Sequence, residues 1–105
     1  MALVHFKESD FDETVNAAPL AVVDFWADWC GPCRMLAPAV DAMDKQYGDR
    51  VLVAKVNVDE EPELARRFGV MSIPTLVFLK NGTEVDRKVG LMPPQALIAA
   101  LEQNL

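Results

Sequence analysis

Apolar residues follow two different periodicities along the chain. Five short stretches of mainly strand-like composition predict β-strands, at residues 3–6, 20–27, 51–58, 75–80 and 84–89. The stretch at 20–27 is almost continuously apolar, which is typical of a central strand buried on both faces of a sheet. Asn81-Gly82 separates the last two stretches and is a strong signal for a tight hairpin.

Between these strands, apolar residues recur every three or four positions, as they do on one face of a helix. The longest such segment follows residue 30 and ends near Gly48, and its apolar face carries Leu36, Val40, Met43 and Tyr47. Two shorter helices are expected, one from Ser9 as its cap to about Asn16 and one from Pro62 to about Gly69. A last helix opens at Pro93-Pro94, and on it Leu97, Leu101 and Leu105 share a face with Ile98.

The resulting order of elements is β-α-β-α-β-α-β-β-α. Successive βαβ units require the long apolar strands to pair in parallel, and the hairpin adds an antiparallel portion. We therefore predict an α/β fold with a central mixed sheet of four to five strands and helices on both faces. A length of 105 residues favours one domain that spans residues 1–105.

The chain is acidic, with a formal net charge of −6. A nucleic-acid-binding protein should carry a basic face, and none is visible, so nucleic acid is not expected as a partner. The first residues lack the basic head and long apolar core of a targeting signal, and no apolar run approaches the ~20 residues of a membrane span. We expect no membrane association, a cytoplasmic location and a monomer.

Cys30 and Cys33 are the two cysteines. A structural zinc site needs about four ligands, which two cysteines and the distant His5 cannot supply. As a structural crosslink the pair would contribute little, because closing so short a loop stabilises by only about 2 kcal/mol in the chain-entropy model, against ~4.7 kcal/mol for a ~100-residue loop. A redox pair that opens and closes explains the spacing better.

The position of the pair predicts a reactive thiol. It follows a central strand and precedes a helix, where open α/β sheets place their sites. With Cys30 as the N-cap, its thiolate could accept a hydrogen bond from the backbone N–H of Cys33, and the N–H that Pro32 lacks is not needed there. The helix N-terminus also favours negative charge, so we expect a lowered pKa for Cys30. Cys33, one turn further in, should be more covered.

The chain also resembles the thioredoxin family. Residues 24–33, Asp-Phe-Trp-Ala-Asp-Trp-Cys-Gly-Pro-Cys, are similar to the family's active-site segment almost throughout. Residues 53–59 resemble its central strand, and three further motifs match in order and spacing, at 73–76, 80–82 and 88–90. The resemblance covers essentially the whole chain and implies a thioredoxin fold and the reduction of protein disulfides.

The resemblance implies a role for each matching residue. Cys30 would be the attacking nucleophile, Cys33 the resolving thiol, and Pro74 a cis proline that faces them. Backbone at Ile73 would pair with the substrate as an added strand. An apolar docking rim would consist of Trp29, Gly31, Pro32, Ile73, Pro74, Gly90 and Leu91. The electron donor would be NADPH-linked thioredoxin reductase, and the protein itself would hold no cofactor.

Two charged residues interrupt the apolar strands. Asp24 either reaches water at the strand end or is buried with a raised pKa and acts as general base on Cys33, which the resemblance favours. Lys55 either extends to the surface or, as the family pattern implies, lies near Asp24 and offsets its charge. We expect the indole N–H of Trp26 to bond Asp59.

Two other functions are compatible with these residues. An oxidase or isomerase would use the same exchange chemistry, although the Gly-Pro dipeptide and the acidic composition without a signal favour a reductase. A non-catalytic subunit that holds a partner on the apolar rim is the alternative from another class. The redox potential against glutathione tests the first, and a Cys30→Ser, Cys33→Ser double variant tests the second.

Overall fold

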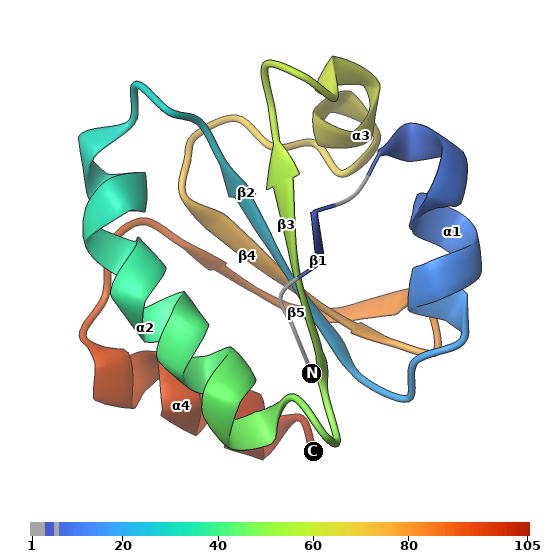
Figure 1. Ribbon diagram of the computed structural model, residues 1–105, viewed down its shortest axis with the longest axis vertical. Coiled ribbons are helices and arrows are strands. Elements are labelled where there is room, and N and C mark those ends of the chain that lie inside the picture. Colours follow the sequence, from blue (N-terminus) through green and yellow to red (C-terminus); the bar gives the residue numbers. More distant parts are fainter. Residues whose placement is uncertain (1–3, 6) are drawn as a thin grey trace.

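Strand β2 lies at the centre of a sheet of order β1-β3-β2-β4-β5 in the computed structural model, which describes residues 4–5 and 7–105 (Figure 1). The elements follow the chain as β1 (Val4–His5), α1 (Glu8–Asn16), β2 (Ala21–Trp26), α2 (Gly31–Tyr47), β3 (Leu52–Asn57), α3 (Pro62–Arg67), β4 (Thr75–Lys80), β5 (Thr83–Val89) and α4 (Pro94–Gln103). The expected α/β fold with a mixed sheet is confirmed.

The strands on the two sides of β2 run in opposite directions. β3 pairs with β2 in parallel and β4 pairs with it antiparallel, while β1 and β5 form the two edges. In this register Asp24 lies between Lys55 of β3 and Leu76 of β4, and Phe25 lies beside Thr75. The carboxyl end of β2 therefore meets the start of β4 at one end of the sheet.

Helices cover both faces of the sheet, with α2 and α4 on one side and α1 and α3 on the other (Figure 1). Val22 points into the layer beneath α2 and α4, while Val23 and Phe25 point into the layer beneath α1 and α3. This alternation in an almost entirely buried strand explains why its sequence is a nearly continuous apolar run. The predicted apolar face of α2 is confirmed, since Leu36, Val40, Met43 and Tyr47 are all buried.

Local turn signals are confirmed as well. Asn81 and Gly82 have φ angles of 49° and 86°, and positive φ at both central residues is what a tight hairpin between twisted strands requires. Gly48 caps α2, with its backbone N–H donating to the carbonyl oxygen of Asp44 at 2.7 Å.

Two expected helix ends are wrong. Ser9 does not cap α1, because the N-cap residue is Lys7. The backbone N–H of Lys7 donates a hydrogen bond to the Asp10 carboxylate at 3.1 Å, so Asp10 in the first turn satisfies this N–H at the start of the helix. Leu105 is not part of the buried face of α4, because the helix ends at Gln103 and leaves this side chain 52% exposed. Of the expected strand at 3–6, residues 4 and 5 form β1, while residues 3 and 6 lie outside the described part of the chain.

Candidate functional site

Cys30 occupies the junction between β2 and α2. It is the N-cap of α2, and its sulfur accepts a hydrogen bond of 3.2 Å from the backbone N–H of Cys33, as the spacing predicts. Its own backbone N–H donates to the carbonyl oxygen of Ala27 at 3.2 Å, which closes the turn that leaves the strand. Pro32 stands in the first turn, where its missing N–H costs no helical hydrogen bond.

The two cysteines form a disulfide, with their Cα atoms 5.2 Å apart. Both are buried to the same extent, at 4% exposure each, so the expectation that Cys33 is the more covered of the two is wrong for this oxidised form. Access nevertheless differs between them, because Cys30 lines the neighbouring groove and Cys33 does not. The groove therefore opens onto Cys30.

The loop that precedes β4 lies next to the disulfide. The Ile73–Pro74 peptide bond is cis, and the Cys30 sulfur lies 3.7 Å from the carbonyl oxygen of Ile73. Pro74 is buried, and its carbonyl oxygen accepts a hydrogen bond of 2.9 Å from the backbone N–H of Gly90, just after β5. Segments that are distant in sequence thus meet at the cysteines.

A groove of about 510 Å³ lies beside Cys30, and its wall is largely apolar. Of the expected docking rim, Trp29, Gly31, Pro32 and Ile73 line this groove. Pro74, which is buried, and Gly90 do not line it, and neither does Leu91, which is 48% exposed. Sequence reasoning missed part of the wall, formed by Val58, Ala65, Val70, Met71 and Ser72.

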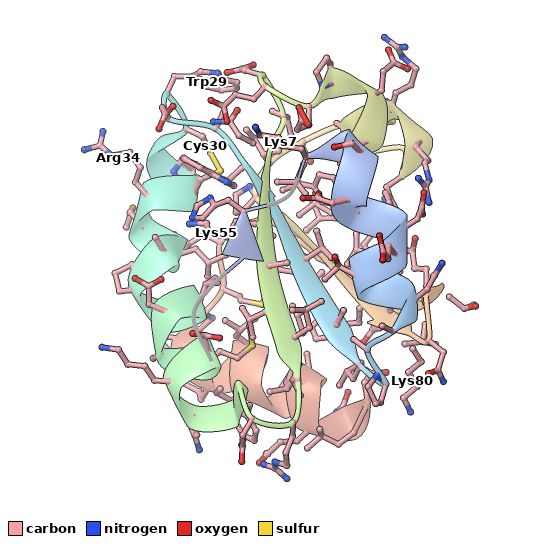
Figure 2. All side chains as sticks on the ribbon, turned by 45° about the vertical axis from the view of Figure 1, so that its right-hand side comes forward. Lys7, Trp29, Cys30, Arg34, Lys55 and Lys80 are labelled. Carbon is pink, nitrogen blue, oxygen red and sulfur yellow. A yellow bond between two sulfur atoms is a disulfide. The ribbon has the colours of Figure 1, made fainter. Side chains whose placement is uncertain are left out.

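The exposed tryptophan at the rim is held by a carboxylate. The indole N–H of Trp29 donates to Asp59 Oδ2 at 2.7 Å, and Figure 2 shows the residue above Cys30 at one end of the molecule. The expected bond from Trp26 to Asp59 is wrong: the buried indole nitrogen of Trp26 has no hydrogen-bond partner among the described residues. Trp29 lies in the turn between β2 and α2, and its exposed side chain reaches Asp59 in the loop after β3.

Asp24 and Lys55 form a buried pair across β2 and β3. Their closest nitrogen–oxygen distance, from Nζ to Oδ2, is 4.0 Å, and Lys55 is 9% exposed, so it does not extend into solvent. The Lys55 ammonium also lies 4.7 Å from the centre of the Trp26 ring, a cation–π contact. In the part of the chain that the structure describes, Asp24 Oδ1 has no hydrogen-bond partner.

Burial raises the pKa of Asp24 to about 6, and the positive charge of Lys55 lowers it in part. Such a carboxyl group gains and loses its proton near neutral pH, as a general base must. Side chains two residues apart on a strand point to the same face, so Asp24 faces the α2 layer together with Val22, which belongs to the same buried cluster as Leu36. Cys33 is buried on α2 one turn before Leu36, and Figure 2 places Lys55 in this layer below Cys30.

Residues 4–5 and 7–105 contain no group of three or more histidine, cysteine or acidic side chains placed to bind a metal ion. None of the helices described is both long and apolar enough to cross a membrane.

A disulfide that bridges the first turn of a helix, opposite a cis-proline loop in a mixed sheet, defines a thiol–disulfide oxidoreductase. The thioredoxin family model matches residues 2–103. The chain is 48% identical over 93 residues to thioredoxin 1 of Synechococcus elongatus, covering 89% of this chain and 87% of the relative. It is 43% identical over 105 residues to thioredoxin of Staphylococcus haemolyticus, covering 100% of both chains.

A solved structure agrees with these relatives. A mutant thioredoxin from Halobacterium salinarum superposes with a TM-score of 0.90 at 36% identity, covering 97% of this chain and 89% of that chain. The chain belongs to the thioredoxin family. It is an oxidoreductase that reduces disulfide bonds in protein substrates by dithiol–disulfide exchange through Cys30 and Cys33.

Proposed function

We propose that Cys30 is the attacking nucleophile and Cys33 the resolving thiol of this exchange. In the reduced protein, the Cys30 thiolate attacks one sulfur of a substrate disulfide, forms a mixed disulfide and releases the other substrate sulfur as a thiolate. Cys33 then loses its proton and attacks the Cys30 sulfur. The Cys30–Cys33 disulfide forms, the second substrate sulfur leaves as a thiolate, and the substrate has gained two electrons.

The hydrogen bond from the Cys33 backbone N–H to the Cys30 sulfur carries this assignment. It places the sulfur at the positive end of α2, where a helix stabilises negative charge. A hydrogen bond to an ionised acceptor is stronger than one to a neutral acceptor, so the thiolate of Cys30 is favoured over the thiol.

Asp24 serves as general base for Cys33 in this proposal, directly or through a water molecule. The positive charge of Lys55 partly offsets the negative charge of the Asp24 carboxylate. Support comes from the raised pKa of Asp24, its burial on the α2 side of the sheet and its 4.0 Å separation from Lys55. A carboxylate of this kind takes up the Cys33 proton when the mixed disulfide forms and returns it to solvent after resolution.

Substrates dock on the apolar rim of Trp29, Gly31, Pro32, Ile73, Pro74, Gly90 and Leu91, with the backbone at Ile73 pairing with the substrate chain. The groove beside Cys30, which Trp29, Gly31, Pro32 and Ile73 line, and the proximity of Ile73 to the Cys30 sulfur support this arrangement. NADPH-linked thioredoxin reductase returns the two electrons. The protein acts in the cytoplasm as a monomer of one domain, residues 1–105, without a cofactor of its own.

Insulin reduction tests the proposal. The wild-type protein should precipitate insulin chains in the presence of NADPH and thioredoxin reductase, and Cys30→Ser should abolish this activity. Cys33→Ser should instead accumulate a mixed disulfide with the substrate, detectable by mass under non-reducing conditions. A Cys30→Ser protein that retains activity, or a residue-30 thiol that titrates like a free cysteine, near about pH 8.5, would contradict the assignment.

A further inference from the structure

Trp29 combines exposure with a fixed orientation. Its side chain is 71% exposed, yet its indole N–H is committed to Asp59 at 2.7 Å. The ring forms one wall of the groove that Cys30 also lines. An exposed side chain without such a bond would move among several rotamers, and a ligand that packs on it would then have to restrict that motion at an entropic cost.

Asp59 is itself held in place by the sheet. The side-chain oxygen of Asn57, the last residue of β3, accepts hydrogen bonds from the backbone N–H groups of Asp59 at 2.9 Å and Glu60 at 3.3 Å. Asn57 is buried, so the loop after β3 is tied to a rigid strand. A chain of hydrogen bonds thus runs from the buried sheet to the exposed ring of Trp29.

We propose that Asp59 is a positioning residue for protein substrates, which holds the Trp29 ring as a fixed wall of the docking groove. Asp59 does not touch the reacting sulfurs in this scheme; it acts through Trp29 alone. The inference rests on the proposed docking of substrates at the rim. It identifies Asp59 as the residue that fixes the orientation of Trp29 in that rim before a substrate binds.

The proposal separates two classes of substrate. A protein disulfide brings a stretch of chain that packs along the groove, so its binding depends on an ordered Trp29 wall. A small aromatic disulfide reaches the Cys30 sulfur without occupying the groove's length. Loss of the Asp59 contact should therefore raise KM for a protein substrate and leave kcat, which reports the exchange chemistry, largely as it was.

Three variants test the proposal by insulin reduction with thioredoxin reductase. Asp59→Ala removes the acceptor and should raise KM for insulin about five-fold, the size expected for partial loss of a hydrogen bond to a charged group. Asp59→Asn keeps an acceptor oxygen without the charge and should recover most of the wild-type KM. Glu60→Ala removes the same charge from the exposed neighbouring residue and should behave as wild type.

The indole N–H signal of Trp29, assigned with Trp29→Phe, reports the contact directly by NMR. In Asp59→Ala it should move upfield and exchange faster with solvent, and in Asp59→Asn it should change less. An equal rise in KM for Glu60→Ala, or an equal loss of kcat/KM for insulin and for 5,5′-dithiobis(2-nitrobenzoate), would overturn the proposal. Failure of the wild type to reduce insulin contradicts the proposed function, whereas wild-type activity with an unchanged KM in Asp59→Ala contradicts only this inference.

Discussion

The ammonium group of Lys55 lies 4.0 Å from Asp24 Oδ2, and its second neighbour is the face of the Trp26 ring, 4.7 Å from the ring centre. The two charged residues are paired in the register of β2 and β3, so the backbone of the sheet fixes their separation. At this distance the cation reduces the cost of burying the carboxylate without removing it. The pKa of Asp24 therefore stays above its usual range, at about 6.

This buried carboxyl group should make the oxidised protein less stable at neutral pH than an uncharged equivalent. Its pKa of about 6 when folded exceeds the ordinary value of 3.8, so protonation favours the folded state. The destabilisation is absent below about pH 4, grows as the pH rises through 6 and reaches about 3 kcal/mol above it. Asp24→Asn should raise the free energy of unfolding by about 1–3 kcal/mol at about pH 7.5 and by little at about pH 4.

Guanidinium unfolding of the disulfide form at both pH values measures this difference. Comparing the variant with the wild type at each pH cancels the titration of the other carboxylates, which the two proteins share. A stabilisation of the same size at the acidic and the neutral pH would mean that the charge of Asp24 is not its cause.

The same substitution should slow catalysis while it stabilises the fold. Without a base, Cys33 must lose its proton to solvent before it attacks the Cys30 sulfur, so Asp24→Asn should slow resolution of the mixed disulfide by roughly a hundred-fold or more, on the order of a general-base contribution. Single-turnover release of the second substrate thiol at neutral pH measures the step. Unchanged release kinetics would refute the role of Asp24.

Removing the cation should shift the pH dependence of that step. Lys55→Met leaves the carboxyl group buried without its compensating charge, which raises the pKa of Asp24 further. The pH at which resolution reaches half its maximal rate should therefore move upward. Lys80→Met is the matched control, because Lys80 is exposed at the end of β4 and lies far from Cys30 in Figure 2. A profile that shifts equally in both variants would point to net charge instead of the pair.

Leu101 on α4 and Leu105 just beyond its end provide a test of which side chains pack in the hydrophobic core. Leu101 is fully buried between α4 and the sheet, whereas Leu105 is 52% exposed beyond the helix. Leu101→Ala should lower the free energy of unfolding by about 2–5 kcal/mol, and Leu105→Ala should change it by less than about 0.5 kcal/mol. Chemical denaturation of both variants measures this, and similar losses would show that Leu105 packs in solution.

Features that depend on a few neighbouring residues could be predicted from the sequence. The cap at Cys30 follows from one turn of helix, and the hairpin at Asn81-Gly82 follows from two residues that tolerate positive φ. The helix face of Leu36 and Val40 follows from periodicity, because the spacing of apolar residues in the sequence and the geometry of the helix share the same 3.6-residue repeat.

Features that depend on tertiary packing could not be predicted in this way. Trp26 and Trp29 are equally good donors in the sequence, and only the geometry at the end of β2 decides which one meets Asp59. Ala65 and Val70 enter the groove wall because α3 and the following loop fold over it, and neither residue carries a chemical signal. The periodicity that placed Leu101 correctly also included Leu105, since a repeat does not show where a helix stops.

The direction of one strand decides which loops meet around the sulfurs. β4 runs against β2, with Thr75 beside Phe25, so the residues that lead into β4 arrive where β2 departs. If β4 ran parallel to β2, the Ile73–Pro74 bond would sit near the opposite end of the sheet, about 17 Å away for a strand of this length. A single antiparallel neighbour thus brings Ile73, more than forty positions after Cys30, to the same groove as that cysteine. Inserting residues between the two should be tolerated only where the pairing of β2 with β4 is kept.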